Sequence, residues 1–169
     1  VGVFDVSHMG EFFVSGPEAV AFVDYLLTND FKNAEMNKAV YSPLCRDDGT
    51  IIDDLIAYKI APNNILICVN ASNIAKDWEW ISSKLEGFDC ELTNQSLDYS
   101  LLAIQGPKAE LVLKNLGLGI DDSFSYYSVK EFELDGENLI IARTGYTGED
   151  GFEIFSSHDF AISLWKKLI

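Results

Sequence analysis

Two neighbouring carboxylates interrupt an apolar segment, which reads IIDDLI over residues 51–56. Since successive side chains of a β-strand point to opposite faces, we expect Asp53 and Asp54 to face in opposite directions, with one of them largely buried. A buried charge is costly without a partner, and proteins keep one mainly at a functional site or in an ion pair. The pair is therefore a candidate for chemistry, and a structural ion pair or a turn cap is the alternative.

A third carboxylate, Glu153, stands between two apolar residues at the end of a glycine-rich segment, GYTGEDGFEI, over residues 145–154. Glycines allow a backbone to approach a ligand closely. A carboxylate accepts two parallel hydrogen bonds, so it matches a ligand edge with two adjacent N–H donors, such as a 2-aminopyrimidinone ring. Glu153 is therefore a candidate ligand-binding residue, whereas Glu149 and Asp150 are predicted to be solvated loop charges.

Other catalytic classes lack their motifs. The sequence has no G-x-S-x-G elbow, no GxxxxGK[ST] loop and no H-E-x-x-H pair. Its two histidines are His8 and His158, and Ser7 beside His8 would point away from it on an extended chain. The three cysteines are scattered without C-x-x-C spacing, which argues against a zinc site and indicates reduced thiols inside a cell or organelle. We therefore expect no metal and no nucleophilic Ser–His pair.

The composition narrows the classes of partner. The chain has 169 residues, of which 48% are apolar and 23% charged, as in an ordinary globular protein. Twelve Lys and Arg against 27 Asp and Glu give a formal charge of 12 − 27 = −15, which opposes binding to nucleic acid or to an anionic membrane. No apolar run approaches the roughly 20 residues that cross a bilayer, and the N-terminus lacks a signal layout. The first residue is Val1, so we expect the interior of a longer, non-secreted chain.

Strand-like and helix-like segments alternate at short intervals, and several are joined as hairpins, which predicts an α+β fold rather than a doubly wound parallel sheet. Ser15 and Glu18 fit a capping box at the start of the first helix. Asp135 and Gly136 form a D-G turn signal between two short strands. The predicted strands are 10–14, 40–45, 51–60, 65–69, 90–93, 99–105, 132–134, 139–143 and 152–155, and helices are predicted after 15–18, over 73–85, over 107–116 and up to 169.

A short motif occurs twice. Residues 13–19 read FVSGPEA and residues 103–109 read AIQGPKA, so their prolines lie 107 − 17 = 90 positions apart. Each copy follows a strand and precedes a helix, a connecting stretch and a hairpin, which favours an internal duplication. The alternative is that Gly-Pro simply starts helices well. We predict two related α+β units, approximately 1–95 and 96–169.

Six segments together resemble the T-protein family of the glycine cleavage system, whose members are aminomethyltransferases. The resemblance runs in order through essentially all 169 residues. Family members are longer at both ends, which implies that the N-terminal start and the C-terminal barrel-like domain of the family fold lie outside this chain. The segments are FDVSHMGEF (4–12), LTND (27–30), GTIIDDL (49–55), VNASN (69–73), QGPKA (105–109) and RTGYTGEDGFE (143–153).

The resemblance implies a folate-dependent transfer. The aminomethyl group would pass from the lipoyl arm of H-protein to tetrahydrofolate, with release of ammonia and formation of 5,10-methylenetetrahydrofolate. Tetrahydrofolate would be the co-substrate and lipoylated H-protein the partner, with no metal, nucleic acid or membrane involved. The compartment would be the cytoplasm of a bacterium or the mitochondrial matrix of a eukaryote.

The resemblance also implies roles for individual residues. Asp54, the second acid of the IIDDL motif, matches the catalytic residue of the family, and Glu153 matches the residue that holds the pterin ring. The positions that match residues lining the folate cavity are Met9, Tyr41, Asn70, Tyr126 and Tyr146.

Other functions stay open at this point. The chain could be a folate-binding module without turnover or a related folate-dependent demethylase, and the intact Asp53–Asp54 pair favours the transferase over the demethylases. Relatives that maintain iron–sulfur enzymes carry a Lys-Gly-Cys-Tyr-type loop, and residues 143–146 (RTGY) lack its cysteine. A third possibility is a structural fragment that docks on other proteins.

Overall fold

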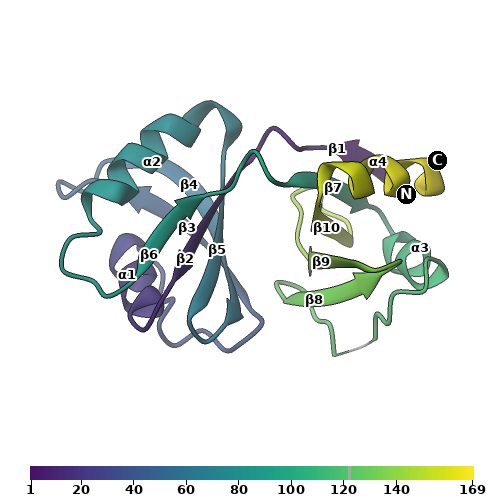
Figure 1. Cartoon of the computed structure of the whole chain (residues 1–169), viewed down its shortest axis with the longest axis horizontal. Helices are drawn as coiled ribbons and strands as arrows, with labels where there is room; N and C mark the ends of the chain where they lie inside the picture. Colours follow the sequence, from purple (N-terminus) through teal and green to yellow (C-terminus); the bar gives the residue numbers. More distant parts are fainter. Residues whose placement is uncertain (122) are drawn as a thin grey trace. The chain divides into compact units, whose positions relative to one another are not determined.

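A computed structural model describes residues 1–121 and 123–169 (Figure 1). The described residues divide into two compact units. We call Met9–Leu97 the Asp54 unit, and Val1–His8 with Asp98–Ile169 the Glu153 unit. In each unit the described residues form one five-stranded antiparallel sheet and two α-helices, which confirms the predicted α+β class.

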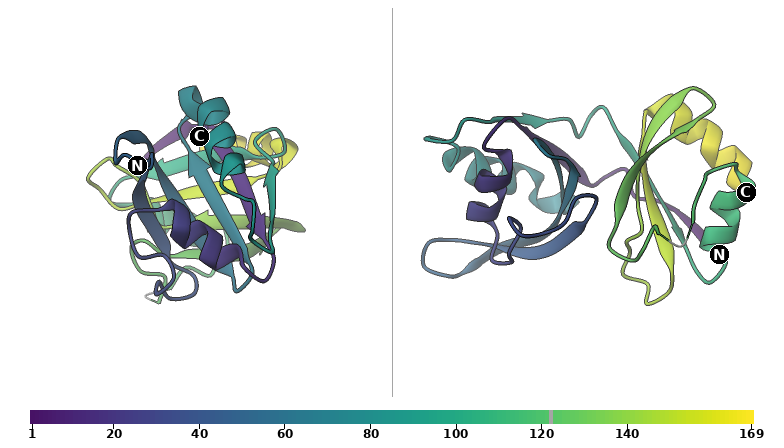
Figure 2. Two further views of the ribbon diagram at one scale, coloured as in Figure 1. Left: turned by 90° about the vertical axis from the view of Figure 1, so that its left-hand side faces the viewer. Right: turned by 90° about the horizontal axis from the view of Figure 1, so that it is seen from below.

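The sheet of the Asp54 unit has the strand order β3-β4-β5-β2-β6, and both helices of the unit lie on one of its faces (Figure 2). Strand alternation explains why: Phe12 and Val14 belong to the core beneath the helices, whereas Glu11 points to the opposite face. Phe22 of α1 and Ile81 of α2 complete this core. The elements are β2 (Gly10–Ser15), α1 (Ala19–Leu26), β3 (Ala39–Cys45), β4 (Ile51–Ala61), β5 (Asn64–Val69), the 3-10 helix η1 (Ala71–Asn73), α2 (Ile74–Ser83) and β6 (Glu91–Asn94).

The Glu153 unit repeats this plan with the strand order β1-β7-β10-β9-β8. Its core joins Ile104 of β7 and Ile154 of β10 to Leu113 of α3 and Leu164 of α4, so both helices again cover one face. The elements are β1 (Gly2–Asp5), β7 (Ser100–Gln105), α3 (Ala109–Asn115), β8 (Val129–Leu134), β9 (Glu137–Ala142), β10 (Gly151–Ser156) and α4 (His158–Leu168).

The two sheets have matching connectivity, with exchanged edge strands. In each, the strand before the Gly-Pro turn (β2 or β7) pairs with the strand before the unit's second helix (β5 or β10). The edge strand β6, which precedes β7 in the chain, pairs with β2, and β1, which precedes β2, pairs with β7. The predicted boundary of 1–95 and 96–169 follows chain order, whereas the pairing assigns residues 1–8 to the Glu153 unit.

The two Gly-Pro turns have nearly identical backbones, as a duplication requires. Gly16 and Gly106 adopt φ values of +129° and +126°, a region that residues with a side chain rarely enter. The helices then begin at Ala19 and Ala109. The predicted capping box is wrong, because α1 has no side-chain cap and the Glu18 carboxylate accepts the Asp89 backbone N–H at 2.7 Å instead.

Other local predictions had mixed outcomes. The D-G signal is confirmed, since Asp135 and Gly136 have positive φ values of 54° and 83° between β8 and β9. Strand β1 was not predicted, because four residues at a sheet edge carry little pattern of their own. None of the helices in the described part of the chain is long and apolar enough to span a membrane.

Candidate functional site

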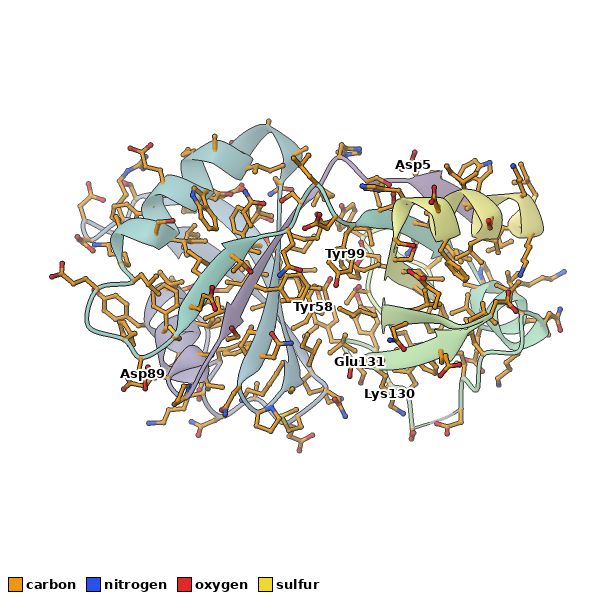
Figure 3. All side chains as sticks on the ribbon, in the orientation of Figure 1. Asp5, Tyr58, Asp89, Tyr99, Lys130 and Glu131 are labelled. Atoms are coloured by element: carbon orange, nitrogen blue, oxygen red, sulfur yellow. The ribbon has the colours of Figure 1, made fainter. Side chains whose placement is uncertain are left out.

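Asp54 lies on the face of its sheet that the helices leave uncovered. It is exposed, and its Oδ2 accepts a hydrogen bond from the Tyr41 hydroxyl at 2.9 Å. Tyr41 reaches it from β3, where it is the cross-strand partner of Ile56, two residues along from Asp54. Tyr58, labelled in Figure 3, lies on β4 like Asp54 and is nearly fully buried.

Asn70 follows the last residue of β5 and joins the two acidic residues. Its side-chain Nδ2 donates to Asp53 Oδ1 at 3.0 Å and to the backbone oxygen of Asp54 at 2.9 Å, and it lies 3.5 Å from Asp54 Oδ1. Met9 is half-buried and lies one residue beyond the Gly10–Val69 pair, which places it across from Asn70 at the same end of the sheet. The structure thus brings together four of the predicted residues, Met9, Tyr41, Asp54 and Asn70.

Asp53 points to the opposite face, as alternation predicts, and is 7% exposed beneath α2. A change of register between Leu44 and Cys45 marks an irregularity opposite it. Asp77 of α2, fully buried, lies within hydrogen-bond reach of Asp53. Burial, and after it the Asp53 carboxylate, raises the pKa of Asp77 to about 7. Burial raises the pKa of Asp53 too, but hydrogen bonds from Asp77 and Asn70 outweigh it and leave that pKa below its ordinary value.

Glu153 occupies a comparable place in the other unit. It lies on β10 opposite Ala103 of β7 and Ala142 of β9, on the face away from the helices. It is buried and accepts a hydrogen bond from the Thr144 hydroxyl. A cavity of about 220 Å³ opens beside it, with apolar walls from Phe4 and Val6. The cavity also borders Ala103, Gln105, Gly145, Tyr146 and Thr147, so a buried carboxylate meets a small, mostly apolar space within this unit.

The glycine-rich loop beside Glu153 is fixed by Gln105. Its side chain donates to the Thr144 backbone oxygen at 3.1 Å and accepts from the Thr147 hydroxyl at 3.2 Å. A Cβ atom at Gly145 would lie 2.2 Å from Gln105 Oε1, and one at Gly151 would lie 2.1 Å from it. A side chain at either position would therefore displace the Gln105 amide, and the φ of +149° at Gly145 also favours glycine there.

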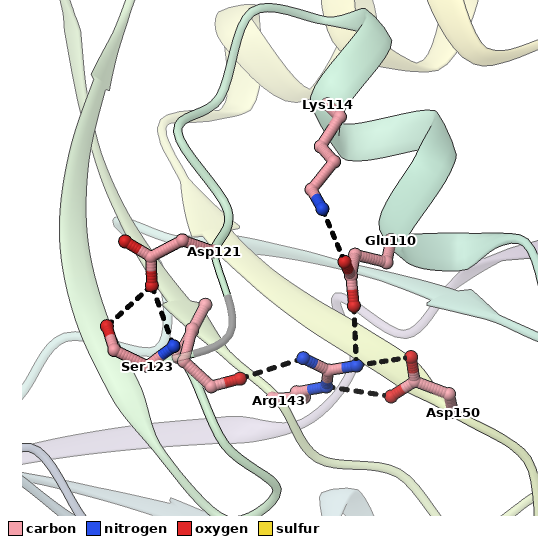
Figure 4. A network of polar contacts seen from close by, with 7 residues as sticks. Glu110, Lys114, Asp121, Ser123, Arg143 and Asp150 are labelled. Carbon is pink, nitrogen blue, oxygen red and sulfur yellow. Dashed lines mark hydrogen bonds and ion pairs between the residues drawn. The ribbon is translucent and has the colours of Figure 1, made fainter.

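The prediction that Asp150 is a solvated loop charge is wrong. Figure 4 shows its carboxylate paired with Arg143 through two hydrogen bonds, of 2.9 Å from Nε and 2.7 Å from Nη2. Arg143 also donates to Glu110 at 2.8 Å and to the Phe124 backbone oxygen at 2.8 Å. Such paired Arg–carboxylate contacts fix geometry well, so this network clamps both ends of the loop.

The remaining two predicted residues are exposed aromatics of the Glu153 unit. Tyr146 is 80% exposed at the rim of the cavity. Tyr126 packs edge-on against Tyr127, with ring centroids 4.7 Å apart. Burial, then Tyr126 and Glu153, raise the pKa of Tyr127.

Three residues of these sites were missed from the sequence: Asp77, Gln105 and Thr144. Asp77 follows Lys76 in a helix with polar residues, so nothing local marks it as buried. Gln105 and Thr144 lie inside the quoted segments QGPKA and RTGYTGEDGFE, but their roles depend on contacts between strands, which the sequence does not show. Within residues 1–121 and 123–169, no cluster of three or more His, Cys, Asp or Glu residues could hold a metal ion.

Comparisons with known proteins place the chain among its relatives. The family model described as GCVT N-terminal domain matches residues 1–169. The chain is 48% identical to an aminomethyltransferase of Thermotoga maritima, over 100% of this chain and 46% of the relative. It is 44% identical to an aminomethyltransferase of Alkaliphilus metalliredigens, over 99% of this chain and 46% of the relative. The chain thus spans about half the length of the curated relatives it matches.

Two solved structures are similar to it. The glycine cleavage system aminomethyltransferase T of Bartonella henselae matches with a TM-score of 0.90 and 36% identity, over 99% of this chain and 45% of that one. A heterotetrameric sarcosine oxidase of Corynebacterium matches with a TM-score of 0.69, over 98% of this chain and 80% of that one. At 16% identity, the second likeness shows a shared fold alone.

Proposed function

Because the chain belongs to the family of GCVT N-terminal domains, we propose that it is the catalytic and folate-binding part of a glycine cleavage aminomethyltransferase. The whole protein would move the aminomethyl carbon from the lipoyl arm of H-protein to tetrahydrofolate. The products would be ammonia, 5,10-methylenetetrahydrofolate and the reduced lipoyl thiol. The observation that carries the proposal is Asp54, an exposed carboxylate held by Tyr41 at the end of a sheet that also presents Asn70 and Met9.

The proposed reaction makes two bonds and breaks two at one carbon. The bonds from the methylene carbon to the amino nitrogen and to the lipoyl sulfur break. Two folate nitrogens form new bonds to that carbon, and the two hydrogens they lose end up on ammonia and on the thiol. Positive charge develops at the carbon as the first bond breaks.

Asp54 suits this reaction because a fixed negative charge stabilises developing positive charge. The Tyr41 hydroxyl donates to Oδ2 and orients the carboxylate, which leaves acceptor capacity for the N–H of an attacking amine. Asp53 has no such part in the proposal, because it points to the opposite face.

Glu153 suits the pterin ring for a different reason. Its carboxylate is buried beside a mostly apolar cavity, where a pair of N–H donors would offset the cost of burial. Thr144 already donates to Oε2, which fixes the direction of the group. We propose that Glu153 binds the 2-amino and N3–H donors of the pterin, with Tyr146 and Tyr126 as aromatic lining.

The direct test is an assay of the whole protein with aminomethyl-loaded H-protein and tetrahydrofolate. The proposal expects release of ammonia and formation of 5,10-methylenetetrahydrofolate in equal amounts, with both dependent on both substrates. Ammonia release that proceeds equally well without folate would contradict it. A protein that binds folate but never transfers the carbon would be a folate-binding module instead.

Exchanging Glu153 for Gln tests the pterin assignment. Glu153→Gln replaces one acceptor by a donor, which leaves a mismatched contact and weakens folate binding by about 1–3 kcal/mol. A calorimetric titration of the whole protein with tetrahydrofolate measures this, and Glu149→Gln, an exposed acid of the same loop, is the matched control. Equal affinity in the Glu153 variant and the wild type would remove Glu153 from the binding site.

A further inference from the structure

Where β4 meets α2, three buried carboxylate oxygens have no hydrogen-bond partner among the described residues. They are Oδ2 of Asp53 and both oxygens of Asp77. An unpaired buried carboxylate is costly, and two in contact repel each other strongly. The two groups nevertheless lie within hydrogen-bond reach of each other. A single proton held between them removes both difficulties, because it supplies a donor and leaves one negative charge instead of two.

We propose that Asp53 and Asp77 share one proton, and that this acid–carboxylate pair fixes the side chain of Asn70 against Asp54. The pair would be a positioning device that links helix α2 to the exposed carboxylate. The effect of the Asp53–Asp77 pair on turnover rests on the proposed function, whereas the existence of the shared proton does not.

The charges around the pair decide which carboxyl keeps the proton. Asp53 receives the Asn70 amide at 3.0 Å, which favours its ionised form. Among the described residues, the charges that act on Asp77 are those of Asp53 and Asp54 of β4 and of Lys76 of its own helix. Lys76 directs its ammonium to the backbone oxygen of Ile52 at 2.6 Å. Asp77 is therefore the neutral acid and donates to Asp53.

The consequence for Asn70 is a fixed amide orientation. Only the NH₂ end of an amide can donate, and here it meets two acceptors, Asp53 Oδ1 and the Asp54 backbone oxygen. The NH₂ end also lies 3.5 Å from Asp54 Oδ1, beside the carboxylate assigned to catalysis. If Asp53 were protonated it would be a weaker acceptor, and if both acids were ionised they would repel each other, so Asn70 would be held less firmly on the Asp53 side. A neutral Asp77 thus keeps Asn70 aligned.

The first test follows the proton itself in the whole protein, with carbon-13 NMR of aspartate carboxyl groups. The proposal expects one carboxyl signal, absent in Asp77→Asn, to titrate well above the ordinary range of aspartate. Glu79→Gln, an exposed acid of the same helix, leaves that signal unchanged. A wild-type protein in which every aspartate titrates in the ordinary range overturns the proposal, and this result requires no variant to fold.

The second test asks whether the pair positions Asn70. Asp77→Asn keeps a permanent N–H donor toward Asp53, so the Asn70 side-chain amide signals keep their wild-type shifts, and turnover of the whole protein stays within about threefold. Asp77→Ala removes the donor, so the Asn70 amide signals broaden and turnover falls more than tenfold, which the Asn variant rescues. Unchanged Asn70 signals in Asp77→Ala overturn the positioning role. A protein that keeps the NMR signatures but transfers no carbon refutes the proposed function alone.

Discussion

At the scale of single residues, burial decides what each acid of the Asp54 unit does. Asp54 stays exposed, Asp53 is buried with partners, and Glu11 is fully buried. Neither carboxylate oxygen of Glu11 has a hydrogen-bond partner among the described residues. Burial raises the pKa of Glu11 to about 8, so the folded protein holds this group as a neutral acid.

The neutral Glu11 predicts a pH dependence of stability. Unfolded Glu11 loses its proton above its ordinary pKa of 4.5, whereas the folded protein keeps it until about pH 8. The free energy of unfolding therefore falls as pH rises through this window, by up to about 1.4 kcal/mol per pH unit. Asp77, whose pKa is also raised, adds to the fall below about pH 7.

Urea unfolding at a series of pH values measures this effect. In Glu11→Gln the free energy of unfolding should fall less steeply with pH than in the wild type, whereas in Glu86→Gln, a change at an exposed acid, it should fall as in the wild type. If the free energy of unfolding depends on pH equally in Glu11→Gln and the wild type, Glu11 is ionised in the folded state.

At the scale of elements, the sequence predicted most strands and the four α-helices of the described residues because their patterns are local. The IIDDLI strand, the Gly-Pro helix starts and the D-G hairpin each depend on neighbours in the chain. The pairing of β1 with β7 and of β6 with β2 could not be predicted, because the residues of a short edge strand do not indicate which strand it pairs with. The same reason hid Asp77, which meets Asp53 from 77 − 53 = 24 residues away.

In the loop beside Glu153, the backbone at Gly145 lies too close to Gln105 for a side chain. Gly145→Ala would place a methyl group against Gln105 at φ +149°, so we expect a loss of about 2–4 kcal/mol of stability and a displaced loop. Gly148→Ala is the matched control, since its φ is +78° but its surroundings are open, and it should cost about 1 kcal/mol. Removing the obstacle with Gln105→Ala should make the double variant less destabilised than the sum of the two changes. If the losses of stability caused by the two changes, measured by chemical unfolding, simply add, Gln105 is not the residue that excludes a side chain at position 145.

At the scale of the whole chain, the repeated α+β plan explains where the acids lie. Two copies of one α+β plan each cover one sheet face with helices, and the opposite faces carry Asp54 in one unit and Glu153 in the other. The repeat of strand, Gly-Pro turn and helix was visible in the sequence, and so were the motifs that flank both acids. Which strand face each acid takes, and what holds it there, required the sheet register.

We propose that Asp54, and not Asp53, acts on the reacting carbon of the substrate. The most direct measurement compares turnover and folate affinity of Asp54→Asn with those of the wild-type whole protein. Asp54→Asn keeps the size of the side chain and removes its charge, so we predict that kcat falls by about 10²–10³-fold while the Kd for tetrahydrofolate changes less than about threefold. Asp53→Asn keeps an oxygen acceptor for Asn70 and should lose mainly stability, and the exposed Asp47→Asn should change neither kcat nor the Kd. Near-wild-type turnover in Asp54→Asn together with an inactive Asp53→Asn would contradict the account.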